Sequence, residues 1–134
     1  MRIGILTGGG DAPGINAVIR AIVRKAIQNY GYETLGIKDG WLGLIQGDFT
    51  SLEIKTLSGL LSKGGTILGT SRTNPFKSAD GPSCILKNVS ENNIEAIIAI
   101  GGDDTLGVAA KLYEMGLPVV GIPKTIDNDL VGTD

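Results

Sequence analysis

One apolar run that ends on glycines and carboxylates constrains the fold more than any other stretch of the chain. Residues 97–105 read Ile-Ile-Ala-Ile-Gly-Gly-Asp-Asp-Thr. Such an apolar run is typical of a strand buried on both faces, as in a parallel sheet. Ligands of open α/β sheets bind beyond the carboxyl ends of these strands. The glycines allow close approach to the backbone, and the following helix start offers free N–H groups, so the stretch predicts a phosphate-binding turn.

The two carboxylates in this turn need a positive partner if phosphate binds there. A divalent cation shared by Asp103 and phosphate oxygens supplies it most simply. The alternative is that Asp103 or Asp104 only caps the helix, where acidic residues are favoured.

The remaining pattern alternates strands with helices. Strands are predicted at 3–7, 32–37, 94–100 and 117–122, and helices at 57–62, 84–92 and 105–115, with a short helix or turn at 39–45. A further helix is expected from Pro13 until Gly31, the proline suiting its first turn. Its buried face should comprise Ile15, Val18, Ile19, Ile22, Val23 and Ile27, and that of helix 105–115 should comprise Leu106, Ala109, Ala110 and Leu112. This order predicts an α/β fold: a three-layer sandwich with a mostly parallel sheet and helices on both faces.

Composition narrows the functional classes. At 134 residues the chain is expected to be one domain, and its net charge of −2 with no long basic stretch argues against nucleic acid and anionic membranes. It has no histidine and one cysteine, Cys84, which excludes His-dependent triads and thiolate zinc sites within the chain. No apolar segment approaches the ~20 residues of a membrane span, so a cytoplasmic protein is expected.

A second glycine-rich turn follows the first predicted strand. Residues 8–14 read Gly-Gly-Gly-Asp-Ala-Pro-Gly, which suits a phosphate cradle between a strand and a helix. It is not a dinucleotide fingerprint, because Pro13 stands where the third glycine belongs, nor a Walker A loop, because Ile15 replaces the lysine. A tight turn without a ligand is the alternative.

Further charged residues follow other predicted strands and turns. Asp127 and Asp129 lie two residues apart after the last strand, so one can accept a proton from a hydroxyl while the other supports position or metal. Lys124 adds a cation beside them, and the donor fork of Arg72 suits phosphate oxygens. An Asx-stabilised turn and a solvated loop arginine are the alternatives. Since the motif-bearing strands all end in such clusters, their ends should share one sheet edge, which fits phosphoryl transfer.

Three motifs together resemble the N-terminal part of the 6-phosphofructokinase family. They are residues 9–16, the Gly-Gly-Asp run at 101–103 and Thr-Ile-Asp-Asn-Asp at 125–129. The resemblance covers the whole chain and implies a Rossmann-like N-terminal domain that transfers phosphate to the 1-hydroxyl of fructose 6-phosphate with Mg²⁺. It also implies a homo-oligomer in the full-length form.

The resemblance implies a role for each matching residue. Contacts to the phosphoryl donor fall to Gly10, Arg72, Gly102, Asp103, Asp104 and Thr105. Asp103 would bind the metal. Thr125, Ile126 and Asp127 would meet the sugar, with Asp127 as general base, and Asp129, Asp104 and Lys124 would assist the transfer.

Two positions bear on the choice of donor. ATP-using relatives resemble Gly-Gly-Asp-Gly and commonly Pro-Gly-Thr-Ile-Asp, whereas Asp104 and Lys124 resemble the pyrophosphate-dependent type. A carboxylate at position 104 would fill the space of the α-phosphate and repel it. Two unit charges ~4 Å apart at an effective dielectric of 20 interact by about 4 kcal/mol, which salt and metal reduce. Asp104 weighs more than Lys124, because some ATP-using relatives carry a lysine there.

The resemblance also implies that residues 1–134 form a truncated donor-binding domain. Family members continue into a second, sugar-phosphate domain that this sequence lacks, so little kinase activity is expected from the fragment. The ATP-dependent enzyme and a non-catalytic phosphate-binding module remain alternatives.

Overall fold

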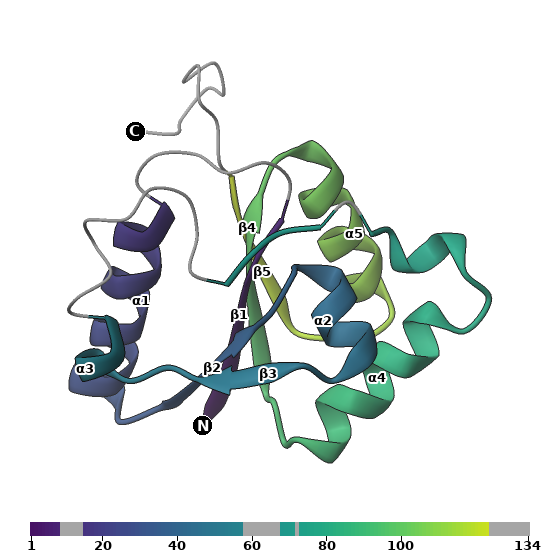
Figure 1. Ribbon diagram of the computed structural model, residues 1–134. Helices are drawn as coiled ribbons and strands as arrows, with labels where there is room; N and C mark the ends of the chain where they lie inside the picture. The colour runs from purple at the N-terminus through teal and green to yellow at the C-terminus, as the bar shows by residue number, and fades with distance from the viewer. Residues whose placement is uncertain (9–14, 58–67, 72, 124–134) are drawn as a thin grey trace.

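A five-stranded sheet forms the middle layer of the protein (Figure 1). The computed structural model describes residues 1–8, 15–57, 68–71 and 73–123. In chain order the elements are β1 (Arg2–Thr7), α1 (Ile15–Tyr30), β2 (Glu33–Ile37), α2 (Trp41–Gln46), β3 (Phe49–Ser51), α3 (Ile54–Leu57), the 3-10 helix η1 (Pro75–Lys77), α4 (Gly81–Glu91), β4 (Ala96–Gly101), α5 (Asp103–Glu114) and β5 (Val119–Pro123).

The sheet is mostly parallel, as the sequence predicts. Its strand order is β3-β2-β1-β4-β5, and β1 pairs in parallel with both β2 and β4. β5 continues the parallel pairing on the other side of β4. β3 alone runs antiparallel, against β2. Strands that carry the sequence motifs, β1, β4 and β5, are therefore neighbours.

Helices cover both faces of the sheet, which confirms the three-layer sandwich. Alternate side chains of β1 enter different cores: Ile5 packs with α1 and α3, whereas Leu6 packs with α2, α4 and α5. Figure 1 shows these two groups of helices on opposite sides of the strands. Within the described part of the chain, no helix has the length and apolar character needed to cross a membrane.

The predicted elements that lie within the described residues are present with shifted ends, and some predicted core positions are wrong. Val18 is 38% exposed, and Ala26 takes a buried place on α1 instead. On α5 the buried residues are Thr105, Val108, Ala109 and Leu112, so Ala110 was wrongly placed in the core. On α1 and α5 the buried face is rotated relative to the predicted one, because packing on the sheet determines which face of a helix is covered. Residues 58–62 of the predicted helix 57–62 lie outside the described residues.

The sequence pattern does not predict the antiparallel strand β3. It has only three residues, Phe-Thr-Ser, and two of its side chains are half-buried while one is exposed. So short a segment shows no clear alternation. The pairing of β3 with β2 continues one step past the strand ends, where the Lys38 N–H donates to the Asp48 carbonyl at 3.1 Å.

The Thr105 side chain, at the start of α5, packs closely against Gly8 and Gly101 at the ends of β1 and β4. It is 4% exposed. A Cβ on Gly101 would lie 2.6 Å from the Thr105 Cβ, and a Cβ on Gly8 would overlap the Thr105 hydroxyl. The glycines that end β1 and β4 are therefore required by close packing.

Close packing at Gly101 and open space at Gly107 predict opposite changes in stability when each glycine is replaced by alanine. Gly101→Ala should lower the free energy of unfolding by about 1–3 kcal/mol, because the added methyl group overpacks the site. Gly107→Ala is the matched control: a Cβ there meets nothing within 4 Å. Because Gly107 lies inside α5, alanine should raise stability by about 0.5–1 kcal/mol. Urea unfolding of both variants measures the two changes, and equal shifts of the same sign would contradict the packing argument.

Candidate active site

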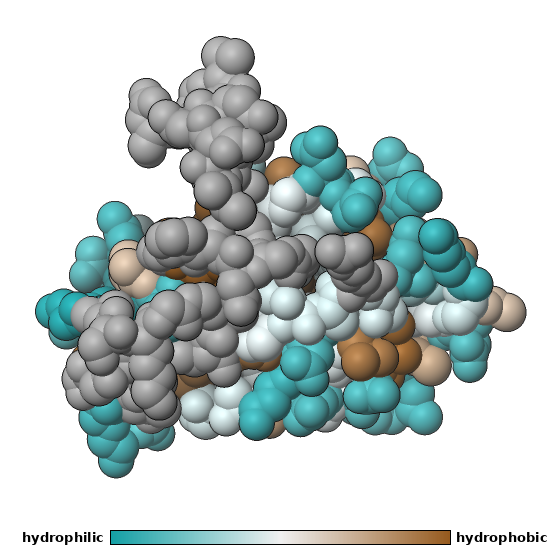
Figure 2. Space-filling model, turned by 45° about the horizontal axis from the view of Figure 1, so that its top comes forward, coloured by the Kyte–Doolittle hydropathy of each residue, from teal (hydrophilic) through white to brown (hydrophobic). Residues whose placement is uncertain are grey.

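The ends of β1, β4 and β5 lie side by side at one edge of the sheet. Thr7 is in register with Ile100, and Gly101 with Pro123. The Gly8 N–H extends the pairing by donating to the Ile100 carbonyl at 2.8 Å. All three sequence motifs therefore begin at this edge, as expected from parallel strands. Figure 2, turned to bring this edge forward, shows strongly hydrophilic side chains around the rim and paler, weakly polar surface near the middle.

The first turn of α5 carries Asp103 and Asp104 at that edge. The N-cap is Gly102, and the first helical hydrogen bond runs from the Leu106 N–H to the Gly102 carbonyl at 3.0 Å. The backbone N–H groups of Asp103, Asp104 and Thr105 therefore precede the helical ladder and are available to an anion.

Neither aspartate is the N-cap residue of this helix, so the capping part of the structural alternative is wrong. Gly102 occupies the N-cap, and no side chain caps it. Both carboxylates instead lie in the first helical turn, where the helix dipole favours negative charge. Both side chains are exposed, and neither takes part in an ion pair among the described residues. They remain available for a ligand.

Asp103 is compatible with a bound Mg²⁺ if phosphate supplies the other oxygen ligands. No cluster of three or more acidic, cysteine or histidine side chains within the described ranges could hold a metal ion. Mg²⁺, however, commonly keeps several waters and binds through one or two carboxylates together with substrate phosphates. An exposed carboxylate beside free N–H groups fits that mode, in which phosphate supplies the other oxygens.

Thr105 differs from Asp103 and Asp104 at the predicted site, because it is buried whereas they are exposed. Its side chain is buried between the glycines that end β1 and β4. Its backbone N–H, in the first turn of α5, is the group that suits the predicted donor contact.

Other predicted site residues lie outside the described residues. These are Gly10, Arg72, Lys124, Thr125, Ile126, Asp127 and Asp129, together with Asp11 of the glycine-rich turn. The structure brings together the positions where their segments begin: Gly8 after β1, Ser71 before Arg72, and Pro123 at the end of β5.

One feature of this edge has no counterpart in the sequence motifs. The hydroxyl of the buried Thr7 donates to the Gly69 carbonyl at 3.0 Å, and the Ser71 hydroxyl donates to the Asp39 carbonyl at 2.6 Å. These bonds hold the segment before Arg72 against the ends of β1 and β2. The Asp39-Gly40 pair is a turn signal in the sequence, but nothing in the sequence pairs it with Ser71.

Similarity to known proteins agrees with this geometry. A family model described as Phosphofructokinase matches residues 2–134. The "Pyrophosphate--fructose 6-phosphate 1-phosphotransferase" of Streptomyces coelicolor is 57% identical over 135 residues, covering all of this chain and 40% of the relative. The "ATP-dependent 6-phosphofructokinase 3" of Bacteroides thetaiotaomicron is 51% identical over 140 residues, covering all of this chain and 42% of the relative.

A solved structure agrees as well. The crystal structure of Pichia pastoris phosphofructokinase in the T-state superposes with a TM-score of 0.87 at 37% identity, over 99% of this chain and 16% of that one. The chain thus spans about 40% of the length of the curated relatives it matches. On the family model, which covers nearly every residue, the chain belongs to the phosphofructokinase family.

Proposed function

We propose that the chain is the phosphoryl-donor-binding part of a pyrophosphate-dependent 6-phosphofructokinase. The enzyme would transfer phosphate from pyrophosphate to the 1-hydroxyl of fructose 6-phosphate with Mg²⁺, giving fructose 1,6-bisphosphate in the cytoplasm. A homo-oligomeric complete enzyme belongs to the same proposal.

One observation carries the proposal: two exposed carboxylates and free N–H groups occupy the start of α5, where β1, β4 and β5 end together. A bound phosphate needs hydrogen-bond donors, and its metal ion needs a carboxylate close by. Because parallel strands end at one edge of the sheet, the loops that follow them can supply these groups at one place.

The roles divide between donor and acceptor. Gly10, Arg72 and the N–H groups at the start of α5 bind pyrophosphate, and Asp103 holds Mg²⁺. The metal neutralises charge on the phosphate oxygens when it is bound. Thr125, Ile126 and Asp127 hold the sugar phosphate, while Lys124 and Asp129 support the transferring group.

The transfer itself needs a base and a fixed donor. Asp127 accepts the proton of the sugar 1-hydroxyl while that oxygen bonds to the terminal phosphorus of pyrophosphate. The bridging P–O bond breaks, and inorganic phosphate leaves with the bonding electrons. Positioning and charge neutralisation supply most of the remaining rate.

Asp104 supports pyrophosphate over ATP as the donor. Its exposed carboxylate lies in the first turn of α5, next to Asp103, where an α-phosphate would meet a second negative charge. Identity to relatives alone separates the donors poorly, because a pyrophosphate enzyme matches at 57% and an ATP enzyme at 51%. ATP dependence is therefore the competing function.

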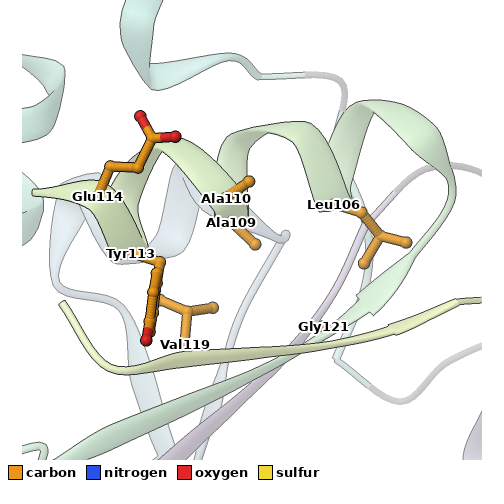
Figure 3. A pocket seen from close by; sticks show the side chains of 7 residues that line it. All are labelled: Leu106, Ala109, Ala110, Tyr113, Glu114, Val119 and Gly121. Atoms are coloured by element: carbon orange, nitrogen blue, oxygen red, sulfur yellow. The ribbon is translucent and has the colours of Figure 1, made fainter.

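An exposed groove supports the proposal that this part works within a longer fold. The groove, of about 610 Å³, lies between α5 and the edge strand β5 (Figure 3). Its lining includes Leu106, Ala109 and Val119. Tyr113 also lines the groove and is 66% exposed, whereas Val120, on the other face of β5, is 59% exposed. Among the described residues no strand pairs with the outer edge of β5. A parallel edge beside apolar side chains is commonly covered by further polypeptide, which this proposal expects in the complete protein.

The isolated 134-residue chain should therefore show little or no kinase activity. The chain spans about 40% of the length of its curated relatives, and the proposal assigns sugar-phosphate binding in part to residues outside this stretch. Purified chain is assayed with fructose 6-phosphate, Mg²⁺ and either pyrophosphate or ATP, with a complete relative as the positive control. Robust turnover by the isolated chain would contradict this domain assignment.

Asp104→Gly in the complete protein should shift donor use toward ATP. Loss of a charge interaction of up to about 4 kcal/mol, reduced by salt and metal, should raise kcat/KM for ATP at least about tenfold. Asp104→Asn is the control, because it removes charge and keeps volume. An increase with glycine alone would identify volume as the barrier, and no increase with either would show that Asp104 does not select the donor.

Asp127→Ser in the complete protein should abolish turnover and spare donor binding. Loss of a general base lowers kcat by about 10²–10⁴-fold, whereas pyrophosphate affinity, measured calorimetrically with Mg²⁺, should change little. Asp80→Ser is the matched control, since Asp80 is exposed and its side chain makes no capping bond. Unchanged kcat in Asp127→Ser would exclude the catalytic role, and lost pyrophosphate binding would assign Asp127 to the donor site.

A further inference from the structure

The first turn of α5 has an outward side and an inward side. Asp103 and Asp104 are exposed. Thr105, with 4% of its surface exposed, is buried, and Leu106 is half-buried. The outward pair comprises the carboxylates that the proposed function assigns to the metal and the donor. The inward pair joins the helix to the sheet, so both roles belong to adjacent residues of a single turn.

Thr105 packs on the ends of β1 and β4 through its γ-methyl group. A Cβ built on Gly101 would lie 2.8 Å from this methyl carbon, and a Cβ built on Gly8 would lie 3.0 Å from it. The two strand ends are themselves joined there, because the Gly8 N–H donates to the Ile100 carbonyl at 2.8 Å. The methyl group therefore contacts both of the paired strands.

Leu106 makes the corresponding contact with β5. A Cβ built on Gly121 would lie 2.7 Å from the Leu106 Cδ2, so the leucine covers the backbone of the edge strand. Figure 3 shows Leu106 on the side of α5 that faces the strand carrying Gly121. Two consecutive side chains thus hold the first turn of α5 on all three strands that precede the sequence motifs.

The residue before this turn provides no side chain to hold it. Gly102 is the N-cap, and a Cβ at this position would meet nothing within 4 Å. Within the described part of the chain, no side chain caps the helix. The N–H groups of a first helical turn have no intrahelical partner either. The contacts of Thr105 and Leu106 therefore fix where these N–H groups lie relative to the sheet.

We propose that the Thr105 side chain positions the donor-binding N–H groups at the start of α5. By packing on Gly8 and Gly101, its methyl group holds the first turn at one place on the sheet edge, where the N–H groups meet pyrophosphate oxygens. This inference rests on the proposed donor site at the start of α5. Groups that are already in place lose less freedom on binding, so a looser turn binds pyrophosphate more weakly. The role belongs to the shape of the side chain and does not require its hydroxyl to contact a ligand.

Two variants of Thr105 in the complete protein separate the effect of shape from that of the hydroxyl. Thr105→Ser removes the methyl group and keeps the hydroxyl, and it should raise KM for pyrophosphate about 2- to 10-fold, the range for ordering one side chain. Thr105→Val keeps the branched shape, so KM for pyrophosphate should stay at the wild-type value. KM for fructose 6-phosphate, kcat and Tm are measured alongside, and KM for the sugar should not change in either variant.

Thr34→Ser is the matched control. Thr34 is also buried, with 3% of its surface exposed, and it lies near the start of β2, at the opposite end of the sheet from the candidate site. Its hydroxyl donates to the Leu52 carbonyl at 2.7 Å, a bond that serine can keep. This variant loses the same methyl group from a buried threonine, so it should lower Tm without changing KM for pyrophosphate.

The outcomes separate the inference from the proposed function. A raised KM for pyrophosphate in Thr105→Val would assign the effect to the hydroxyl and overturn the positioning role. An unchanged KM in Thr105→Ser, an equal rise in KM for both substrates, or an equal rise in Thr34→Ser would also overturn it, since Thr105 would then act on stability alone. A wild-type enzyme that uses ATP and not pyrophosphate would overturn the proposed donor, and this inference with it.

Discussion

Parallel pairing around β4 is the constraint on which the rest of the molecule depends. β4 pairs in parallel with β1 on one side and with β5 on the other, so the segments that follow these three strands all begin at the same edge of the sheet. Three segments far apart in sequence thereby start from one edge. The candidate ligand contacts among the described residues lie at this edge, and their proximity to the other two motif-bearing segments follows from the shared strand direction.

The start of α5 combines opposite electrostatic requirements. Free N–H groups and the positive end of the helix dipole favour anions, yet the same turn presents two carboxylates. With phosphate alone these charges would repel. In the proposed function a divalent cation would make them complementary, with one carboxylate binding the metal and the N–H groups binding phosphate oxygens. In the same proposal the adjacent second carboxylate would discriminate between short and long polyphosphates.

The sequence predicted the parts of this arrangement that depend on local pattern. Strands β1 and β4 were predictable because continuous apolar runs end on glycines, and α5 because its helical spacing follows directly. β3 was missed because a strand of three residues, two half-buried and one exposed, is too short to show a period. Val18 and Ala110 were assigned to the core because spacing alone does not specify how a helix rotates on the sheet. The bonds of Ser71 to Asp39 and of Thr7 to Gly69 join residues 32 and 62 positions apart, so only the folded chain reveals them.

Thr105 has a consequence for how this family can diverge. Its side chain fills the space that a methyl group would need at either Gly8 or Gly101. None of the three positions is free to accept a larger residue unless another becomes smaller. Sequence drift at the end of the sheet should therefore occur in compensated sets, with glycine at 105 where Gly101 has been lost, and alanine or glycine at 105 where Gly8 has been lost.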